Sequence, residues 1–96
     1  MNPEPQLIKE DAGHYYLRGT VDFNTVTRLT HESILDGSEQ VNIDLGGLLS
    51  ADSSAVALLI QWLRQATQED VELRFLNIPE QIKPLIALYD LESIIQ

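Results

Sequence analysis

The most constraining feature of the sequence is a long apolar helical pattern between two segments that alternate apolar and polar residues. Residues 41–45 and 71–76 alternate in the manner of strands. Asp52-Ser53-Ser54 is a helix-start signal between them, and the helical pattern after it runs to about Gln68. A strand, a helix and a second strand in this order predict a crossover unit with two parallel strands.

Shorter elements are expected on both sides of this unit. Their order, β-β-α-β-α-β-α, predicts an α/β fold in which helices cover a mixed sheet of four to five strands. The opening hairpin is expected to be antiparallel. The expected segments are a strand at 7–11, a turn at Asp11-Ala12-Gly13, a strand at 14–21, a helix from Asn24 to about Leu35, a loop at 46–51, a helix at 80–89 with Pro79 in its first turn, and an apolar tail at 91–95.

Length and charge limit the possible functions. A chain of 96 residues is expected to form one domain, here 7–96 after a loose lead-in at 1–6. The net charge of −9 argues against nucleic-acid and lipid-headgroup partners. With no cysteine, no signal peptide and no apolar run long enough to span a bilayer, we expect a cytoplasmic protein without direct membrane insertion.

The long helix carries two apolar stripes at about 100° per residue. One stripe is expected to face the sheet, and its residues are Val56, Leu59, Ile60 and Leu63. The second consists of Ala55, Leu58, Trp62 and Ala66. Either the helix at 80–89 covers this second stripe, or a partner protein does.

The loop before this helix carries two hydroxyls. Asp and Ser are preferred N-cap residues, so Asp52-Ser53-Ser54 has a sufficient role as a helix cap. The alternative is phosphorylation, since a phosphoryl group on Ser54 or Ser53 adds negative charge beside acidic residues and would disrupt a protein interface.

The sequence offers little support for catalysis or metal binding. Neither His14 nor His31 lies near a nucleophile motif such as G-x-S-x-G. Asp44 and Asp52 flank the loop and could form an acid pair, but such residues are more often turn and cap acids. We therefore expect no enzyme activity, no cofactor and no metal site.

The strand, the loop with Asp52-Ser53-Ser54 and the apolar helix together resemble the STAS domain (sulfate transporter and anti-sigma factor antagonist). Gly19-Thr20-Val21-Asp22 is similar to the Gly-x-x-Asp of that family. In one branch, the anti-sigma factor antagonists, the resemblance implies that a partner kinase phosphorylates Ser54. In the other, the small STAS subunit of the ABC transporter that maintains outer-membrane lipid asymmetry (the MlaB type), the corresponding hydroxyl is that of Ser53.

Segments 57–66, 73–82 and 88–91 resemble the transporter branch more closely. This resemblance implies a non-catalytic subunit that binds the transporter's ATPase and lies at the inner membrane through that partner. Ala55 stands where both branches tend to have glycine, and its extra methyl is expected to narrow the space for a partner backbone. The expected contact residues are Leu48, Leu49, Asp52, Ser53, Ser54, Ala55, Leu58 and Trp62.

Two other functions stay open at this point. One is an anti-sigma factor antagonist that is regulated at Ser54 by an anti-sigma factor kinase. The other is a small-ligand sensor, although no set of residues requires a ligand. The charge distribution favours a protein partner with a basic rim and an association that weakens with salt, since 29–63 contains five acidic residues and no Lys or Arg.

Overall fold

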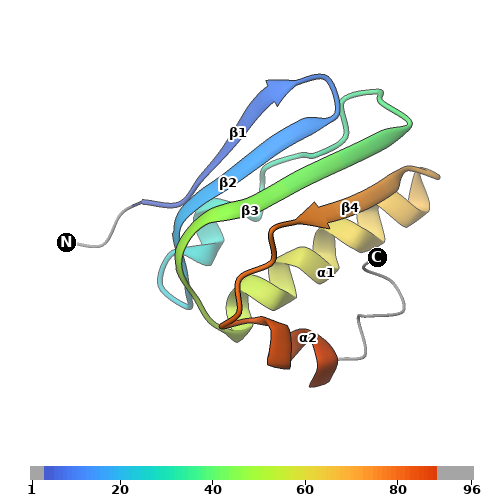
Figure 1. Ribbon diagram of the computed structural model, residues 1–96. Coiled ribbons are helices and arrows are strands. Elements are labelled where there is room, and N and C mark those ends of the chain that lie inside the picture. Colours follow the sequence, from blue (N-terminus) through green and yellow to red (C-terminus); the bar gives the residue numbers. More distant parts are fainter. Residues whose placement is uncertain (1–3, 89–96) are drawn as a thin grey trace.

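The computed structural model describes residues 4–88, in which four strands form one mixed sheet (Figure 1). The strand order is β1-β2-β3-β4; β1 pairs antiparallel with β2, and the other two pairs are parallel. The predicted mixed α/β sheet is confirmed. The strands are β1 (Gln6–Asp11), β2 (His14–Val21), β3 (Gln40–Ala51) and β4 (Glu72–Leu76).

The predicted crossover unit is present as β3, α1 (Ser53–Gln68) and β4. Asp52 is the N-cap of α1, and its Oδ1 accepts the backbone N–H of Ser54 at 2.8 Å. The helix ends in a turn at which Asp70 adopts a positive φ of 56°, a conformation that Asp tolerates better than most residues. The cap and the apolar pattern therefore located this helix correctly at both ends.

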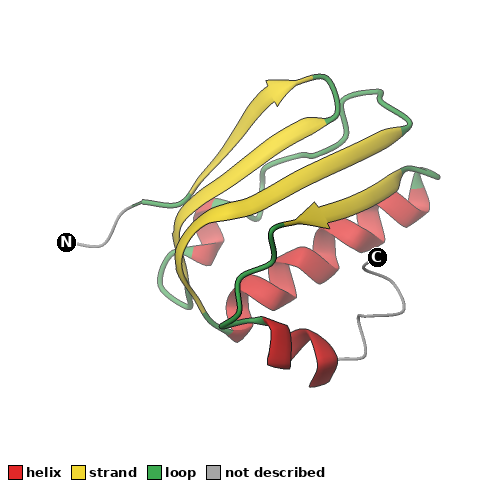
Figure 2. Ribbon diagram, in the orientation of Figure 1, coloured by secondary structure: helices red, strands yellow, loops and turns green. Residues whose placement is uncertain are grey.

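The two faces of the sheet differ in their cover. Figure 2 shows the helices on one side of the sheet. Burial alternates along β4, along residues 14–18 of β2 and along residues 40–45 of β3, as a period of two requires, whereas Gly19, Thr20 and Val21 at the end of β2 are all buried. The opposite face carries no helix within residues 4–88. The buried apolar residues of the strands are Tyr15, Leu17, Val21, Val41, Ile43, Leu45, Leu73 and Phe75.

The second apolar stripe of α1 is buried, so the interpretation of this stripe as a solvent-facing partner surface is wrong. Ala55, Leu58, Trp62 and Ala66 are each at most 2% exposed. They share one apolar core with Leu29, Ile34 and Ile82, which come from the segments on either side of the β3–α1–β4 unit. The stripe is therefore buried within the chain itself; the intramolecular alternative had named only the helix at 80–89, whereas the shared core also includes Leu29 and Ile34 from the segment before β3.

The helix expected from Asn24 to Leu35 is largely absent. Only η1 (Val26–Arg28), a short 3-10 helix, forms there. Asp22 Oδ1 accepts the backbone N–H of Asn24 at 2.9 Å and of Thr25 at 3.1 Å, which fixes a turn, and the following β-branched residues favour helix weakly. Leu29 and Ile34 are buried nonetheless. The spacing of the apolar residues in this segment therefore indicated which residues are buried, but not that they form a helix.

The predicted loop at 46–51 is also wrong, because β3 continues through it to Ala51. The pairing of β3 with β2 shifts register twice. One extra β3 residue lies between the pairs Tyr16↔Asp44 and Arg18↔Gly47, and Leu49 is the extra residue between Leu48 and Ser50. Bulges of this kind bend a strand and turn a side chain outward. Leu49 is accordingly 67% exposed.

The chain ends differ from the expectations in detail. β1 begins at Gln6, inside the expected lead-in, and Pro5 is buried. The last helix, α2 (Lys83–Leu88), begins three residues later than predicted and has Pro84, not Pro79, in its first turn. Its expected end near residue 89 and the tail at 91–95 lie outside the described residues, as does the start of the lead-in at 1–3.

Candidate partner-binding site

Asp52 connects the three elements that meet at one end of the sheet. It follows β3 and caps α1 through Oδ1, and its backbone N–H donates to Val21 O at the end of β2 at 3.4 Å. Its second oxygen, Oδ2, accepts the backbone N–H of Phe23 at 3.2 Å. One carboxylate thus fixes both the start of α1 and the first turn after β2.

Phe23 projects from this turn into solvent and is 82% exposed. Two sets of hydrogen bonds stabilise this turn. The Asp22 carboxylate accepts the backbone N–H groups of Asn24 and Thr25, and Thr25 Oγ1 donates to Thr20 O at 2.8 Å. A large aromatic side chain on a rigid turn, with no core to fill, is typical of a protein contact. Sequence reasoning missed Phe23; its only signal is an aromatic between two turn-forming residues, Asp22 and Asn24.

Phe23 and Leu49 are the two most exposed large apolar side chains in residues 4–85, the part of the chain whose side-chain burial the structure describes. Both lie at the end of the sheet where β2 and β3 finish and α1 begins. Ser53 beside them is exposed, whereas Leu48, Asp52 and Ser54 are half-buried. We refer to Phe23, Leu48, Leu49, Asp52, Ser53 and Ser54 as the docking surface.

A protein-family profile described as "Mlab, STAS domain" matches residues 8–96 of the chain. The protein belongs to the STAS domain family. This family is generally non-catalytic. No curated protein matches the chain. Among solved structures, the anti-sigma factor antagonist SpoIIAA in its unphosphorylated form is similar, with a TM-score of 0.66 and 19% identity over 88% of this chain and 82% of that chain. At this identity the similarity shows the shared fold.

The structure separates the expected contact residues of this STAS domain into two groups. Leu48, Leu49, Asp52, Ser53 and Ser54 come together on the docking surface. Ala55, Leu58 and Trp62 lie in the core and are not accessible in this conformation. Since the Ala55 side chain faces the core, its methyl does not narrow the space outside the loop.

Much of the acidic stretch at 29–63 of the STAS domain serves local structure. Asp36 Oδ2 accepts the backbone N–H of Gly13 at 2.9 Å and the hydroxyl of Tyr15 at 3.1 Å, and it lies 3.4 Å from Lys9 Nζ. Hydrogen bonds, from Ser38 first and then from Gly13, hold the pKa of Asp36 well below its usual range. Burial, and then the hydrogen bond to Asp36, raises the pKa of Tyr15 to about 12.

Asp44 and Asp52 are likewise turn and cap acids rather than an acid pair. Asp44 Oδ1 accepts the backbone N–H of Gly46 at 2.8 Å and the side-chain amide of Asn77 at 3.1 Å. Within residues 4–88, no three His, Asp or Glu side chains gather closely enough to hold a metal ion. In the same range, no helix has the length and apolar character to cross a membrane.

Proposed function

We propose that this STAS domain is an accessory subunit that binds the ATPase of a phospholipid-transporting ABC complex, in which it supports the maintenance of outer-membrane lipid asymmetry. The match to the Mlab-type family supports the class of partner. The exposed pair Phe23 and Leu49 on the docking surface is the observation that supports a protein contact there. The domain is then cytoplasmic and reaches the inner membrane through its partner.

The docking surface has the properties of a protein contact. Hot spots combine large apolar anchors with a fixed backbone, because ordering a flexible anchor on binding costs free energy. The backbone N–H of Phe23 donates to Asp52 at 3.2 Å, and Leu49 is the bulged residue between two paired residues of β3, so the backbone that carries each anchor is held in place before binding. Ser53, small and exposed at the start of α1, adds a hydroxyl that a partner can reach.

The net charge of −9 sets the expected character of the partner surface. Acidic side chains around an apolar contact attract a partner with a basic rim and raise the rate of encounter. Salt screens such exposed charges, so the association rate is expected to fall as ionic strength rises.

The alternative function, an anti-sigma factor antagonist regulated at Ser54 by an anti-sigma factor kinase, draws support from the fold shared with SpoIIAA. Ser53 is exposed whereas Ser54 is half-buried, so Ser53 is the more accessible acceptor in this structure. Intact-mass analysis after incubation with the anti-sigma kinases encoded by the same organism decides the question. A gain of one phosphoryl group that Ser54→Ala abolishes would favour the alternative.

Binding measurements with the purified ATPase test the proposal. Phe23→Ser with Leu49→Ser is expected to weaken binding by about a hundredfold or more, because two anchors are removed. Leu76→Ser is the matched control, since Leu76 is 43% exposed on β4, away from the docking surface. The proposal fails if the wild-type chain does not bind the ATPase, or if the control weakens binding as much as the double variant.

A further inference from the structure

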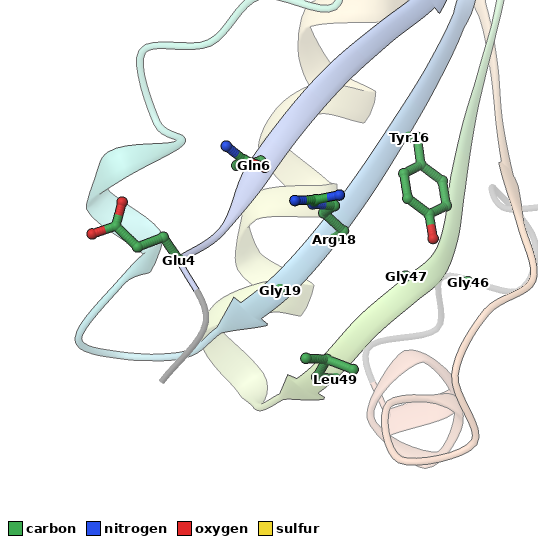
Figure 3. Close-up of a pocket in the computed structure, with 8 residues that line it drawn as sticks. All are labelled: Glu4, Gln6, Tyr16, Arg18, Gly19, Gly46, Gly47 and Leu49. Carbon is green, nitrogen blue, oxygen red and sulfur yellow. The ribbon is translucent and has the colours of Figure 1, made fainter. Parts of the chain in front are cut away.

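The uncovered face of the sheet has a hollow of about 740 Å³ beside the docking surface. Figure 3 shows it over the carboxyl ends of β2 and β3, with Tyr16 and Arg18 on one side and Leu49 at the lower end. Gly46 and Gly47 form its floor, and Gln6 and Glu4 lie along the edge formed by the start of the chain. Leu49 belongs to both the hollow and the docking surface, so the two are continuous.

The first bulge of β3 produces this hollow. Leu45 and Gly46 stand there opposite Leu17 alone, and neither Gly46 nor the paired Gly47 carries a side chain. The ring of Tyr16 packs against the bare backbone of Gly47, since an added Cβ there would lie 2.5 Å from Tyr16 Oη. The backbone of β2 and β3 therefore forms the base of the hollow.

Arg18 differs from most Lys and Arg side chains of this acidic chain in that it forms no ion pair within residues 4–88. Lys9, Arg28, Arg74 and Lys83 each form an ion pair with a carboxylate, at 2.8 to 3.4 Å. Within residues 4–88, Arg18 and Arg64 form no such pair; Arg64 lies on α1 and lines a different hollow. Glu4, the acid nearest the hollow's edge, is paired with Arg28 at 2.9 Å. An exposed guanidinium in a fixed hollow is suited to a carboxylate from outside.

We infer that an extended segment of the bound ATPase lies in this hollow, with a carboxylate on Arg18 and an apolar side chain between Leu49 and Tyr16. This inference rests on the proposed function and adds a second part to its interface. The hollow is open on its outer side, which suits a chain segment that continues onto the docking surface better than a small molecule, because a small molecule would stay largely in contact with water.

Charge reversal provides the first test. Arg18→Glu is expected to weaken binding to the ATPase by about tenfold or more, since it replaces an attraction with a repulsion at a fixed site. Arg64→Glu is the matched control, because it makes the same change at the other unpaired arginine, and it is expected to leave affinity within about twofold. Equal effects of the two variants would reflect net charge alone and would overturn the inference.

A labelling footprint provides the second test. The chain has no cysteine, so Gln6→Cys places one thiol at the hollow and Gln68→Cys places one on α1 as the control. Bound ATPase is expected to slow maleimide labelling at position 6 and not at position 68. Equal labelling rates at position 6 with and without the ATPase overturn the inference. So does protection at position 6 that needs no ATPase and grows with protein concentration, which would indicate a second copy of the chain.

The two proposals fail in different ways. If the wild-type chain does not bind the ATPase, the proposed function fails and the inference falls with it. If Phe23→Ser with Leu49→Ser weakens binding while Arg18→Glu does not, the proposed function stands and only the hollow is wrong.

Discussion

Two groups of apolar side chains on adjoining parts of this STAS domain have opposite environments. Trp62 and its neighbours along α1 are completely enclosed, with Trp62 itself at 0% exposure. Phe23 and Leu49, at the end of the sheet where α1 begins, are largely in water. Both groups are apolar, so hydrophobicity alone does not tell an interaction surface from a core.

The local chain explains the difference. The α1 stripe repeats at helical spacing, which lets several segments pack against it at once. Phe23 lies in a turn and Leu49 in a bulge, at positions that interrupt regular structure and turn a side chain away from the sheet. In the α1 stripe a periodic apolar pattern coincides with the core, whereas at the docking surface the apolar side chains of a turn and a bulge are exposed.

The largest effect is expected from Trp62→Ala, which tests the buried half of the comparison. Removing a fully buried Trp should lower the free energy of unfolding by about 3–5 kcal/mol, measured by urea denaturation. Trp62→Phe should cost less, because it keeps most of the apolar volume and Trp62 Nε1 has no hydrogen-bond partner in the described part of the chain. If Trp62→Ala kept its stability and lost ATPase binding, the stripe would be a surface after all.

A smaller loss of stability is expected from Asp36→Asn. The Asp36 carboxylate accepts hydrogen bonds from Gly13 and Tyr15 and so connects the segment before β3 to the β1–β2 hairpin. The pKa of Asp36 is lower in the folded than in the unfolded chain, so its stabilising contribution is full above the unfolded pKa of about 4. It is lost as the pH falls below that value. Asp36→Asn should therefore flatten the acid side of the stability profile, measured by thermal unfolding between about pH 2 and 6. An unchanged acid limb would contradict the hydrogen bonds at this carboxylate.

The sequence predicted the crossover unit because its signals are local. Asp52 supplies a cap, and the apolar period of α1 and the alternation of 41–45 and 71–76 each fit within one segment. The order of the predicted elements gave the mixed sheet, and the profile match over residues 8–96 confirms the family that these residues resemble. The choice of Leu49 and Ser53 as contact residues came from the family resemblance and stays a prediction.

The errors arose where distant contacts decide the structure. Gly46-Gly47 has weak strand propensity, and only pairing with β2 keeps it in the sheet. Leu29 and Ile34 were assigned to a helix, but they are buried side chains of an irregular segment. That segment begins with a turn that the Asp22 carboxylate stabilises. Phe23 gave no periodic signal, because its position depends on the hydrogen bond to Asp52, 29 residues away.

A third prediction separates the two tasks of Asp52. Asp52→Ala removes the N-cap and should lower the free energy of unfolding by about 1 kcal/mol. In Asp52→Asn the amide oxygen can still accept the backbone N–H of Ser54 and cap the helix. The amide NH2 then takes the place of Oδ2 and cannot accept the backbone N–H of Phe23, so that hydrogen bond is lost. Urea denaturation should therefore show a smaller loss for Asn than for Ala, while both variants weaken ATPase binding. Equal binding by Asp52→Asn and the wild type would mean that the clamp on Phe23 is not needed.

The smallest effect on stability is expected from the anchors themselves. Phe23→Ser and Leu49→Ser each remove a side chain that is already in water, so each should change the free energy of unfolding by less than about 0.5 kcal/mol. Leu45→Ser, a buried leucine on the same strand as Leu49, should be far more costly in the same urea measurement. A loss at Phe23 comparable to that at Leu45 would place Phe23 in the core. If Phe23→Ser leaves stability unchanged and weakens ATPase binding, the effect belongs to the contact alone, and for that reason Phe23 tests the proposed docking surface more sharply than the serines do.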